Sequence, residues 1–326
     1  MWRTRITFCT TMLIFACLFS SCVVQIKAGP PSPGTPIPAR TITPGNRPSA
    51  SSACVDIPPS PNYLTSIGRE QDAVAAINNA RQQEHLPPLH LPGNFYTLPP
   101  TQQQFIILNA ERTDRGLHAL QMDANLAQMA QAYSKQMVDL NFFSHTSPIS
   151  GTFEDRVKSN PAIHGHFTVA ENLAGNPFPG AGAMYEYMYR DTVEACGHRH
   201  NILLPQLTLV GIGLTVGSKY GTISVQEFLS STPDNPYTGG TPDTVPPHIA
   251  IQKSLQVSSL LCQAMATDNV GVVRITWFVD SIGNNGHVGS SFTLDLRSLS
   301  SGQHTILAYA VDGSQNYGMA QVRVTV

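Results

Sequence analysis

A change in hydrophobic periodicity divides this chain of 326 residues into two parts. Before residue 233 many apolar residues recur at three- and four-residue steps, which predicts amphipathic helices. After residue 247 they alternate with polar residues, which predicts half-buried strands. The segment between, 233–247, is rich in proline and contains Gly239–Gly240, a composition typical of a linker. We therefore expect an α+β domain followed by a small all-β domain.

The first part predicts both helices and strands. Asp123 is a suitable N-cap for a helix, and a stripe of apolar residues follows it at helical spacing. This stripe consists of Leu126, Met129, Ala130, Tyr133, Met137 and Leu140. Further helices are expected over 66–84, 102–116 and 185–193. Strands are expected over 208–216 and 222–229, with the glycine-containing turn 217–221 between them.

The second part, 248–326, predicts a β-sandwich. Apolar residues alternate along Val273–Val279, Phe292–Leu296, Leu307–Val311 and Val322–Val326. Turn signals such as Asp312–Gly313 lie between these runs. Short strands at even spacing over about 80 residues are typical of an immunoglobulin-like sandwich.

The N-terminus predicts export. Residues 1–21 combine Arg3 and Arg5 with a short apolar run, as in a signal peptide. Cys22 stands where lipoprotein cysteines become lipidated, although Phe19 departs from the usual pattern and ordinary cleavage stays open. Residues 22–62 are rich in proline and serine, which predicts a disordered stalk. Residues 63–100 are expected to form a helical lead-in to the first domain.

Charge and cysteine usage narrow the class of protein. Charged residues make up 12% of the chain and the formal net charge is −2, which argues against a nucleic-acid partner. Beyond the N-terminal segment only Cys54, Cys196 and Cys262 remain. In an oxidising compartment these allow one disulfide and one free thiol. For Cys196 we favour a buried or disulfide-bonded role over metal ligation.

Three short motifs carry groups suited to metal binding or proton transfer. They are Phe143–Ser144–His145–Thr146, Ala170–Glu171–Asn172–Leu173 and Gly197–His198–Arg199–His200. Imidazole and carboxylate groups bind zinc, and two histidines with one carboxylate leave positions open for water. Without a metal, Glu171 could act as a general base on water.

The order and residue patterns of these motifs resemble those of the CAP superfamily, the cysteine-rich secretory, antigen 5 and pathogenesis-related proteins. The resemblance covers 101–232 and includes Val210–Gly211–Ile212–Gly213 and Val225–Gln226–Glu227–Phe228. It implies a three-layer α–β–α sandwich with an open cleft. The C-terminal part resembles bacterial immunoglobulin-like domains, through Trp277–Phe278–Val279–Asp280 and Ala310–Val311–Asp312.

The resemblance implies that two histidines and two acids line the cleft. His145, Glu171 and His198 match three of these positions, with His200 as a rival for the third. The second acid is where this sequence departs from the family pattern. We rank Glu194 first, then Asp191 and Glu186, with Glu154 as a further candidate that we expect to cap a short helix at 152–157 instead.

The sequence therefore suggests three functions. We favour an extracytoplasmic module, secreted or lipid-anchored, that holds a divalent metal such as zinc or a small ligand in the cleft. Its partner would be a small molecule, a lipid or a cell-wall component of the envelope. The alternatives are a metal-assisted hydrolase of peptide or cell-wall material that uses Glu171, and an adhesion protein that works through the β-sandwich.

Overall fold

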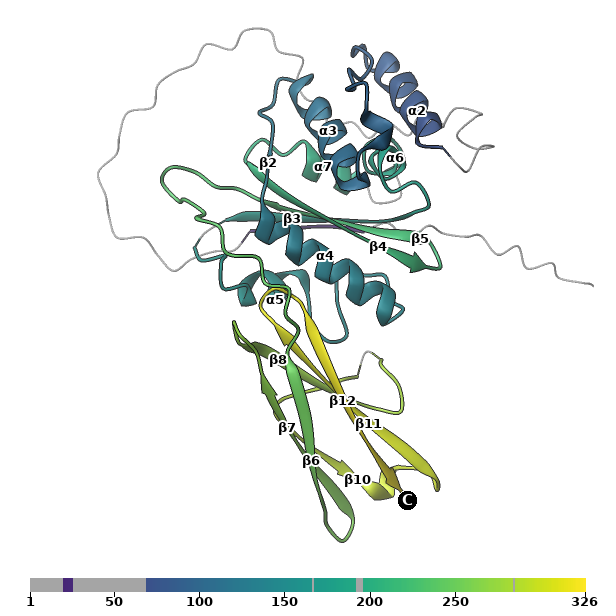
Figure 1. Cartoon of the computed structure of the whole chain (residues 1–326), viewed down its shortest axis with the longest axis vertical. Coiled ribbons are helices and arrows are strands. Elements are labelled where there is room, and N and C mark those ends of the chain that lie inside the picture. The colour runs from purple at the N-terminus through teal and green to yellow at the C-terminus, as the bar shows by residue number, and fades with distance from the viewer. Residues whose placement is uncertain (1–19, 26–68, 166, 192–195, 284) are drawn as a thin grey trace, which may run out of the picture.

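The computed structural model describes residues 20–25, 69–165, 167–191, 196–283 and 285–326. An α+β domain with a sheet between two helical layers lies above a β-sandwich, and the two are stacked along the long axis of the molecule (Figure 1). The predicted three-layer architecture and the all-β second domain are both confirmed. Within these residues, no helix is both long and apolar enough to cross a membrane.

The central sheet has five strands in the order β1–β3–β5–β4–β2. They are β1 Ser20–Gln25, β3 Thr168–Asn176, β5 Gly221–Leu229, β4 Leu209–Ser218 and β2 Gln121–Met122. All neighbouring pairs are antiparallel except β2 and β4, which are parallel. The two strands predicted from alternation are β4 and β5. Strand β1 crosses the predicted boundary between signal peptide and stalk, and these two segments remain predictions.

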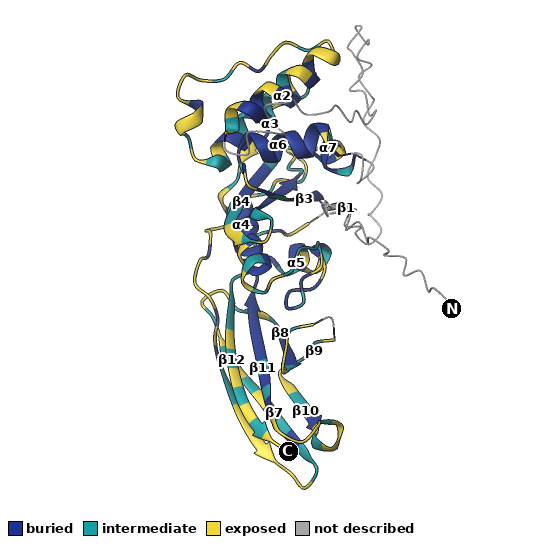
Figure 2. Ribbon diagram, turned by 90° about the vertical axis from the view of Figure 1, so that its right-hand side faces the viewer, coloured by how far each residue is buried: buried dark blue, intermediate teal, exposed yellow. Residues whose placement is uncertain are grey.

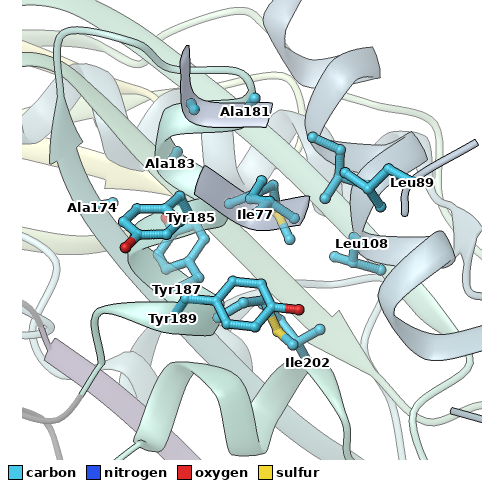
Figure 3. Packing of buried hydrophobic residues seen from close by; sticks show 14 of the residues in the cluster. Ile77, Leu89, Leu108, Ala174, Ala181, Ala183, Tyr185, Tyr187, Tyr189 and Ile202 are labelled. Atoms are coloured by element: carbon cyan, nitrogen blue, oxygen red, sulfur yellow. The ribbon is translucent and has the colours of Figure 1, made fainter. Parts of the chain in front are cut away.

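One face of the sheet is covered by α2 Glu70–Gln83, α3 Pro100–Thr113, α6 Ala181–Tyr189 and α7 Gly197–Ile202. Figure 3 shows how Tyr185, Tyr187 and Tyr189 of α6 pack with side chains from the neighbouring helices. Helix α6 begins and ends four residues before the predicted range of 185–193. Asp191 therefore lies outside the helix, in the connection that leads to α7.

The other face of the sheet is covered by α4 Ala124–Asp139 and α5 Phe153–Ser159. The predicted N-cap is confirmed, since Asp123 Oδ1 accepts a hydrogen bond of 2.8 Å from the backbone N–H of Leu126. Thr152 caps α5 in the same way. On β3, Ala170 and Ala174 belong to the core under α2, α3 and α6, whereas Val169 and Leu173 face α4 and α5. Successive side chains of a strand point to opposite faces, so Glu171 faces the α4–α5 side.

The β-sandwich consists of two antiparallel sheets. One contains β10 Ser291–Asp295, β7 Ser259–Thr267 and β6 His248–Leu255. The other contains β12 Tyr317–Thr325, β11 Gln303–Asp312, β8 Val272–Val279 and β9 His287–Val288. Trp277, Leu260 and Ile306 are buried between the sheets. Two short 3-10 helices, Phe95–Thr97 and Leu296–Ser298, complete the elements in the described part of the chain.

The two domains share a packed junction rather than a bare linker. Ile149 of the α+β domain is fully buried in a cluster with Phe278, Tyr309 and Val311 of the sandwich. Helix α4 also bonds to the turn between β11 and β12: Gln136 Nε2 donates to the carbonyl of Gln315 at 2.7 Å. Figure 2 shows that β11 is buried (dark blue) at the end of the sandwich nearest α5.

The cysteines agree with an oxidising compartment. Cys196 is disulfide-bonded, and its partner is not among the residues whose side chains the structure describes. The prediction that Cys196 is structural rather than metal-ligating is therefore confirmed. Cys262 is a free thiol that is fully buried in the sandwich core.

Candidate functional site

His145 and Glu171 form a directly bonded pair. His145 lies in the loop between α4 and α5, and its Nδ1 is 2.5 Å from Oε1 of Glu171 on β3. The loop is held because Tyr133 donates its hydroxyl to the carbonyl of Ser144, at 2.5 Å. Glu171 is fully buried, and the His145 side chain is 13% exposed. The other ring nitrogen, Nε2, is buried without a hydrogen-bond partner among the described residues.

Arg156 of α5 lies on the same face of the sheet and neutralises the charge of Glu171. Its guanidinium donates to Oε2 of Glu171 and, at 2.7 Å, to the carbonyl of His145. It also lies 3.5 Å from the centroid of the Tyr133 ring, in a cation–π contact. Burial alone would raise the pKa of Glu171, but Arg156 and His145 outweigh it and hold the pKa below its ordinary value. Glu171 is therefore ionised at neutral pH.

Glu227 is a second buried carboxyl that sequence reasoning missed. It lies on β5 directly opposite Glu171 in the antiparallel ladder, and it is 1% exposed. Burial, followed by the charge of Glu171, raises its pKa well above the ordinary value. One signal was available: Glu227 stands between Val225 and Leu229 on the buried face of an alternating strand. A carboxyl group at such a position needs a proton or a cation.

His198 forms the second histidine–acid pair. It lies on α7, fully buried, with Nδ1 2.5 Å from Oδ1 of Asp191 and its ring centroid 5.2 Å from that of Tyr187. The other oxygen of Asp191 accepts the backbone N–H of Arg199 at 3.0 Å, in the first turn of α7. Among the candidate acids whose positions the structure describes, Asp191 is thus the one that bonds to the second histidine. The rival His200 is exposed.

The two pairs are linked through β3. Asn172, the neighbour of Glu171, donates to the carbonyl of His198 at 3.3 Å. Asn201 of α7 donates to the side-chain oxygen of Asn172 at 2.9 Å and to the carbonyl of Glu171 at 3.3 Å. The amide network therefore fixes α7 against the strand that carries Glu171.

The remaining candidates for the second acid have other partners or lie elsewhere. Glu186 is 6% exposed and forms an ion pair of 3.5 Å with Arg190. Glu154 lies in the first turn of α5 and pairs with Lys158 at 2.5 Å, consistent with the expected capping role. Glu194 lies outside the described residues.

The predicted ligands do not form a ready-made three-ligand metal site. In the described ranges, the only group of three or more His, Cys, Asp or Glu residues with ligand atoms within 4.8 Å of one another is Asp243, Asp268 and Asp312. Burial, with the charges of the other two aspartates, raises the pKa of Asp312 to about 7. His145 and His198 instead direct Nδ1 to separate carboxylates. The buried, unpartnered Nε2 of His145 fits a zinc ligand, because zinc-binding imidazoles commonly donate their other nitrogen to an acid.

A groove opens beside His145, between the two domains. Its volume is about 660 Å³. Ser144 and Thr146, which flank His145, line it from the α+β domain, and Arg274 and Ile282 line it from the sandwich. The mixture of hydroxyl groups, the Arg274 guanidinium, the Asp155 carboxylate and apolar side chains suits a small polar ligand.

Comparisons with known proteins agree with this architecture. Residues 106–228 match the family described as CAP, the cysteine-rich secretory protein family. The chain is 34% identical over 38% of its length to the uncharacterized protein YkwD of Bacillus subtilis, covering 44% of that protein. It is 32% identical over 36% of its length to the uncharacterized membrane protein YlbC of the same organism, covering 31%. The matches therefore span less than half of either relative.

A solved structure also matches part of the chain. The crystal structure of an extracellular protein containing an SCP domain from Bacillus anthracis is 32% identical, covers 40% of each chain and has a TM-score of 0.34. Residues 106–228 of this chain are thus a domain of the CAP family, the cysteine-rich secretory proteins, and an immunoglobulin-like β-sandwich follows it.

Proposed function

We propose that this protein is an extracytoplasmic binding module whose CAP domain holds a divalent metal, such as zinc, or a small ligand at His145 and His198. One observation carries the proposal: each histidine has a carboxylate at Nδ1, Glu171 for His145 and Asp191 for His198. A carboxylate at Nδ1 fixes the tautomer of the ring, and for His145 it leaves the lone pair on Nε2, which is buried without a hydrogen-bond partner among the described residues. In this arrangement Glu171 and Asp191 orient the rings and need not touch the ion.

A bound zinc ion would act as a Lewis acid that polarises an oxygen of the ligand. The chain itself would supply the rest of the site. Arg156 keeps Glu171 ionised, so His145 keeps its orientation over the neutral pH range. Ser144, Thr146 and Arg274 in the adjoining groove would bind a polar ligand by hydrogen bonds and charge.

Relatives and the predicted N-terminal signal support the proposed place of action. The relative from Bacillus anthracis is described as extracellular and YlbC as a membrane protein. Together with the predicted signal peptide and the predicted lipid anchor at Cys22, this supports a secreted or surface-anchored protein. A cell-wall component, lipid or small molecule of the envelope is the expected partner.

The test is a calorimetric titration of zinc into the purified protein and into a double variant, His145→Ala with His198→Ala. Saturable binding that the double variant loses supports the metal site. His200→Ala is the matched control, since His200 lies on the same helix as His198 but is exposed, and this variant should bind as the wild type does. Equal binding by all three proteins would remove the proposed site.

A hydrolase is the second candidate, favoured by the pair of buried carboxyls. Glu171 is held ionised and Glu227 is held protonated, and two acids with diverging pKa values are typical of acid–base catalysis. Release of fragments from peptide or cell-wall material, abolished in Glu171→Gln with the fold unchanged, would support it. Release that persists in this variant would exclude Glu171 as the base.

A further inference from the structure

Three aspartates meet at the end of the β-sandwich that contacts the CAP domain. Asp243 comes from the linker, Asp268 from the turn between β7 and β8, and Asp312 from the end of β11. One carboxylate oxygen of each residue lies within 4.8 Å of the other two. Figure 1 shows the β11–β12 turn at this end of the sandwich, next to α5. Segments far apart in sequence thus bring three acids together.

Two of these acids are buried and Asp268 is half-buried, and none of the three has a compensating charge. Asp312 is fully buried and Asp243 is 6% exposed. Throughout the described ranges, no Lys, Arg or His side chain forms an ion pair with any of the three. Buried charges in proteins are normally paired or coordinate a metal, because unpaired ones lose hydration at a large cost. A cation would resolve this arrangement.

The hydrogen bonds around the cluster leave two oxygens available. Oδ1 of Asp243 accepts from the N–H of Val245 at 3.1 Å and the amide of Asn269 at 3.0 Å. Oδ1 of Asp268 accepts the N–H of Val270 at 2.9 Å and of Gly271 at 3.0 Å. The Oδ2 atoms of both residues are buried and have no hydrogen-bond partner within the described part of the chain. Asp243 and Asp268 are thus each held by one oxygen while the other is buried and unused, whereas both oxygens of Asp312 accept hydrogen bonds from Asn316.

The donor set identifies the cation. All donors are carboxylate oxygens, which suit hard cations, whereas zinc sites in proteins usually include nitrogen or sulfur. Calcium binds oxygen at about 2.3–2.6 Å, so two oxygens on one ion are at most about 5 Å apart, which agrees with the observed spacing. We propose that Asp243, Asp268 and Asp312 form a calcium site that ties the linker to the β-sandwich.

The site would act on the junction between the domains. Asn316 donates its side-chain amide to the carbonyl of Asp243 and to Oδ2 of Asp312, both at 2.9 Å. Its own Oδ1 accepts from Gln128 of α4 at 3.2 Å. An ion between the aspartates would therefore order the linker and the β11–β12 turn together, directly beneath α4. Its role is to fix the sandwich on the CAP domain.

The experiment is a calorimetric titration of calcium chloride into chelator-treated, purified protein, with thermal melts in the presence and absence of calcium. The decisive variant is Asp268→Asn, because asparagine keeps the Oδ1 acceptor for Val270 and Gly271 but removes the charge. Asp295→Asn is the matched control, an exposed acid of the same sandwich that pairs with Arg297. Zinc is titrated in parallel to separate this site from the histidines.

Calcium should bind saturably to the wild type, with Kd on the order of 10⁻⁴–10⁻³ M as in other extracellular modules, and should raise Tm. Asp268→Asn should weaken binding at least about tenfold and lose the calcium-dependent rise in Tm, while its Tm without calcium stays at or above that of the wild type because repulsion is relieved. Asp295→Asn should behave as the wild type. No binding by the wild type up to about 10 mM calcium, or unchanged binding by Asp268→Asn, overturns the proposal.

Discussion

Glu171 and Glu227 face each other on neighbouring strands in the buried layer beneath the CAP sheet, and Arg156 bonds to only the first of them. Two carboxylates so close in a dry environment do not both ionise. The arginine assigns the charge to Glu171, and Glu227 keeps the proton. The His145–Glu171 pair that we propose as part of the functional centre therefore lies next to a second acid, Glu227, that stays neutral.

Glu227→Gln should make the stability of the protein less sensitive to rising pH. The folded pKa of Glu227 lies above the unfolded value of about 4.3, so in the wild type unfolding releases a proton and stability falls as pH rises between those two values. Glutamine mimics the protonated acid and removes this loss. As pH rises across that window, the free energy of unfolding of the variant should increase relative to that of the wild type by up to about 1.4 kcal/mol per pH unit. Urea unfolding from pH 5 to pH 8 measures the difference, and a difference that does not change with pH would contradict the assignment of the proton.

Arg156→Met should destabilise the CAP domain strongly. Arg156 is fully buried and is the cation that bonds to Glu171, so the change leaves a buried charge without its partner. Removing one member of a buried ion pair costs about 3–5 kcal/mol. Lys158→Met is the control on the same helix, since Lys158 is 55% exposed in its pair with Glu154 and should change stability little. Chemical denaturation of both variants is the measurement, and equal effects would contradict this account.

Ile149→Ala should loosen the junction between the domains. Ile149 is fully buried against Phe278, Tyr309 and Val311, across the boundary between CAP domain and sandwich. Truncating a buried isoleucine costs about 2–5 kcal/mol. Calorimetry should show a lower melting temperature and a separation of the two domains into distinct transitions. Val273→Ala, at an exposed sandwich position, should leave the melting profile unchanged, and a normal profile for Ile149→Ala would show that the contact does not couple the domains.

Gly211→Ala should disrupt the seat of α4 on the sheet. A Cβ at Gly211 would lie 2.0 Å from the backbone carbon of Leu126, and backbone of the helix cannot move aside as a flexible side chain can. Overpacking of this kind costs about 1–3 kcal/mol or more. Gly93→Ala is the matched control, because a Cβ there meets nothing within 4 Å. The measurements are the fraction of soluble, folded protein and its melting temperature. Both should fall for Gly211→Ala and stay unchanged for Gly93→Ala, and equal values for the two variants would contradict the prediction.

Much of the fold could be predicted because local signals agreed with the tertiary structure. The Asp123 N-cap and the apolar stripe after it define α4, and alternation defines β4, β5, β8 and β11. Strands β6 and β7 were not predicted individually, since their buried and exposed positions follow the packing of the two sheets more than any regular alternation in the sequence. The close approach of α4 explains why glycines stand at 211 and 213.

The candidate site could be predicted only in part. His145, Glu171 and His198 were found from their motifs, but a motif does not show which carboxylate each imidazole meets. Asp191 meets His198 because α6 ends at Tyr189, which leaves Asp191 outside the helix and free to bond to the ring of His198. The partners of Glu171 across the ladder, and the meeting of Asp243, Asp268 and Asp312, depend on strand register and on long-range topology, which no local pattern encodes.

The contact between the β11–β12 turn and α4 also determines how a force on the sandwich would be transmitted. Gln128, Gln136 and Asp139 of that helix bond to Asn316, Gln315 and Tyr317, three consecutive residues of the sandwich. A pulling force applied to the C-terminal domain would therefore pass into the longest helix of the CAP domain as shear spread over three bonds, and would not fall on the linker alone. Tension on the sandwich would then reach α4 and, through that helix, the sheet that carries Glu171.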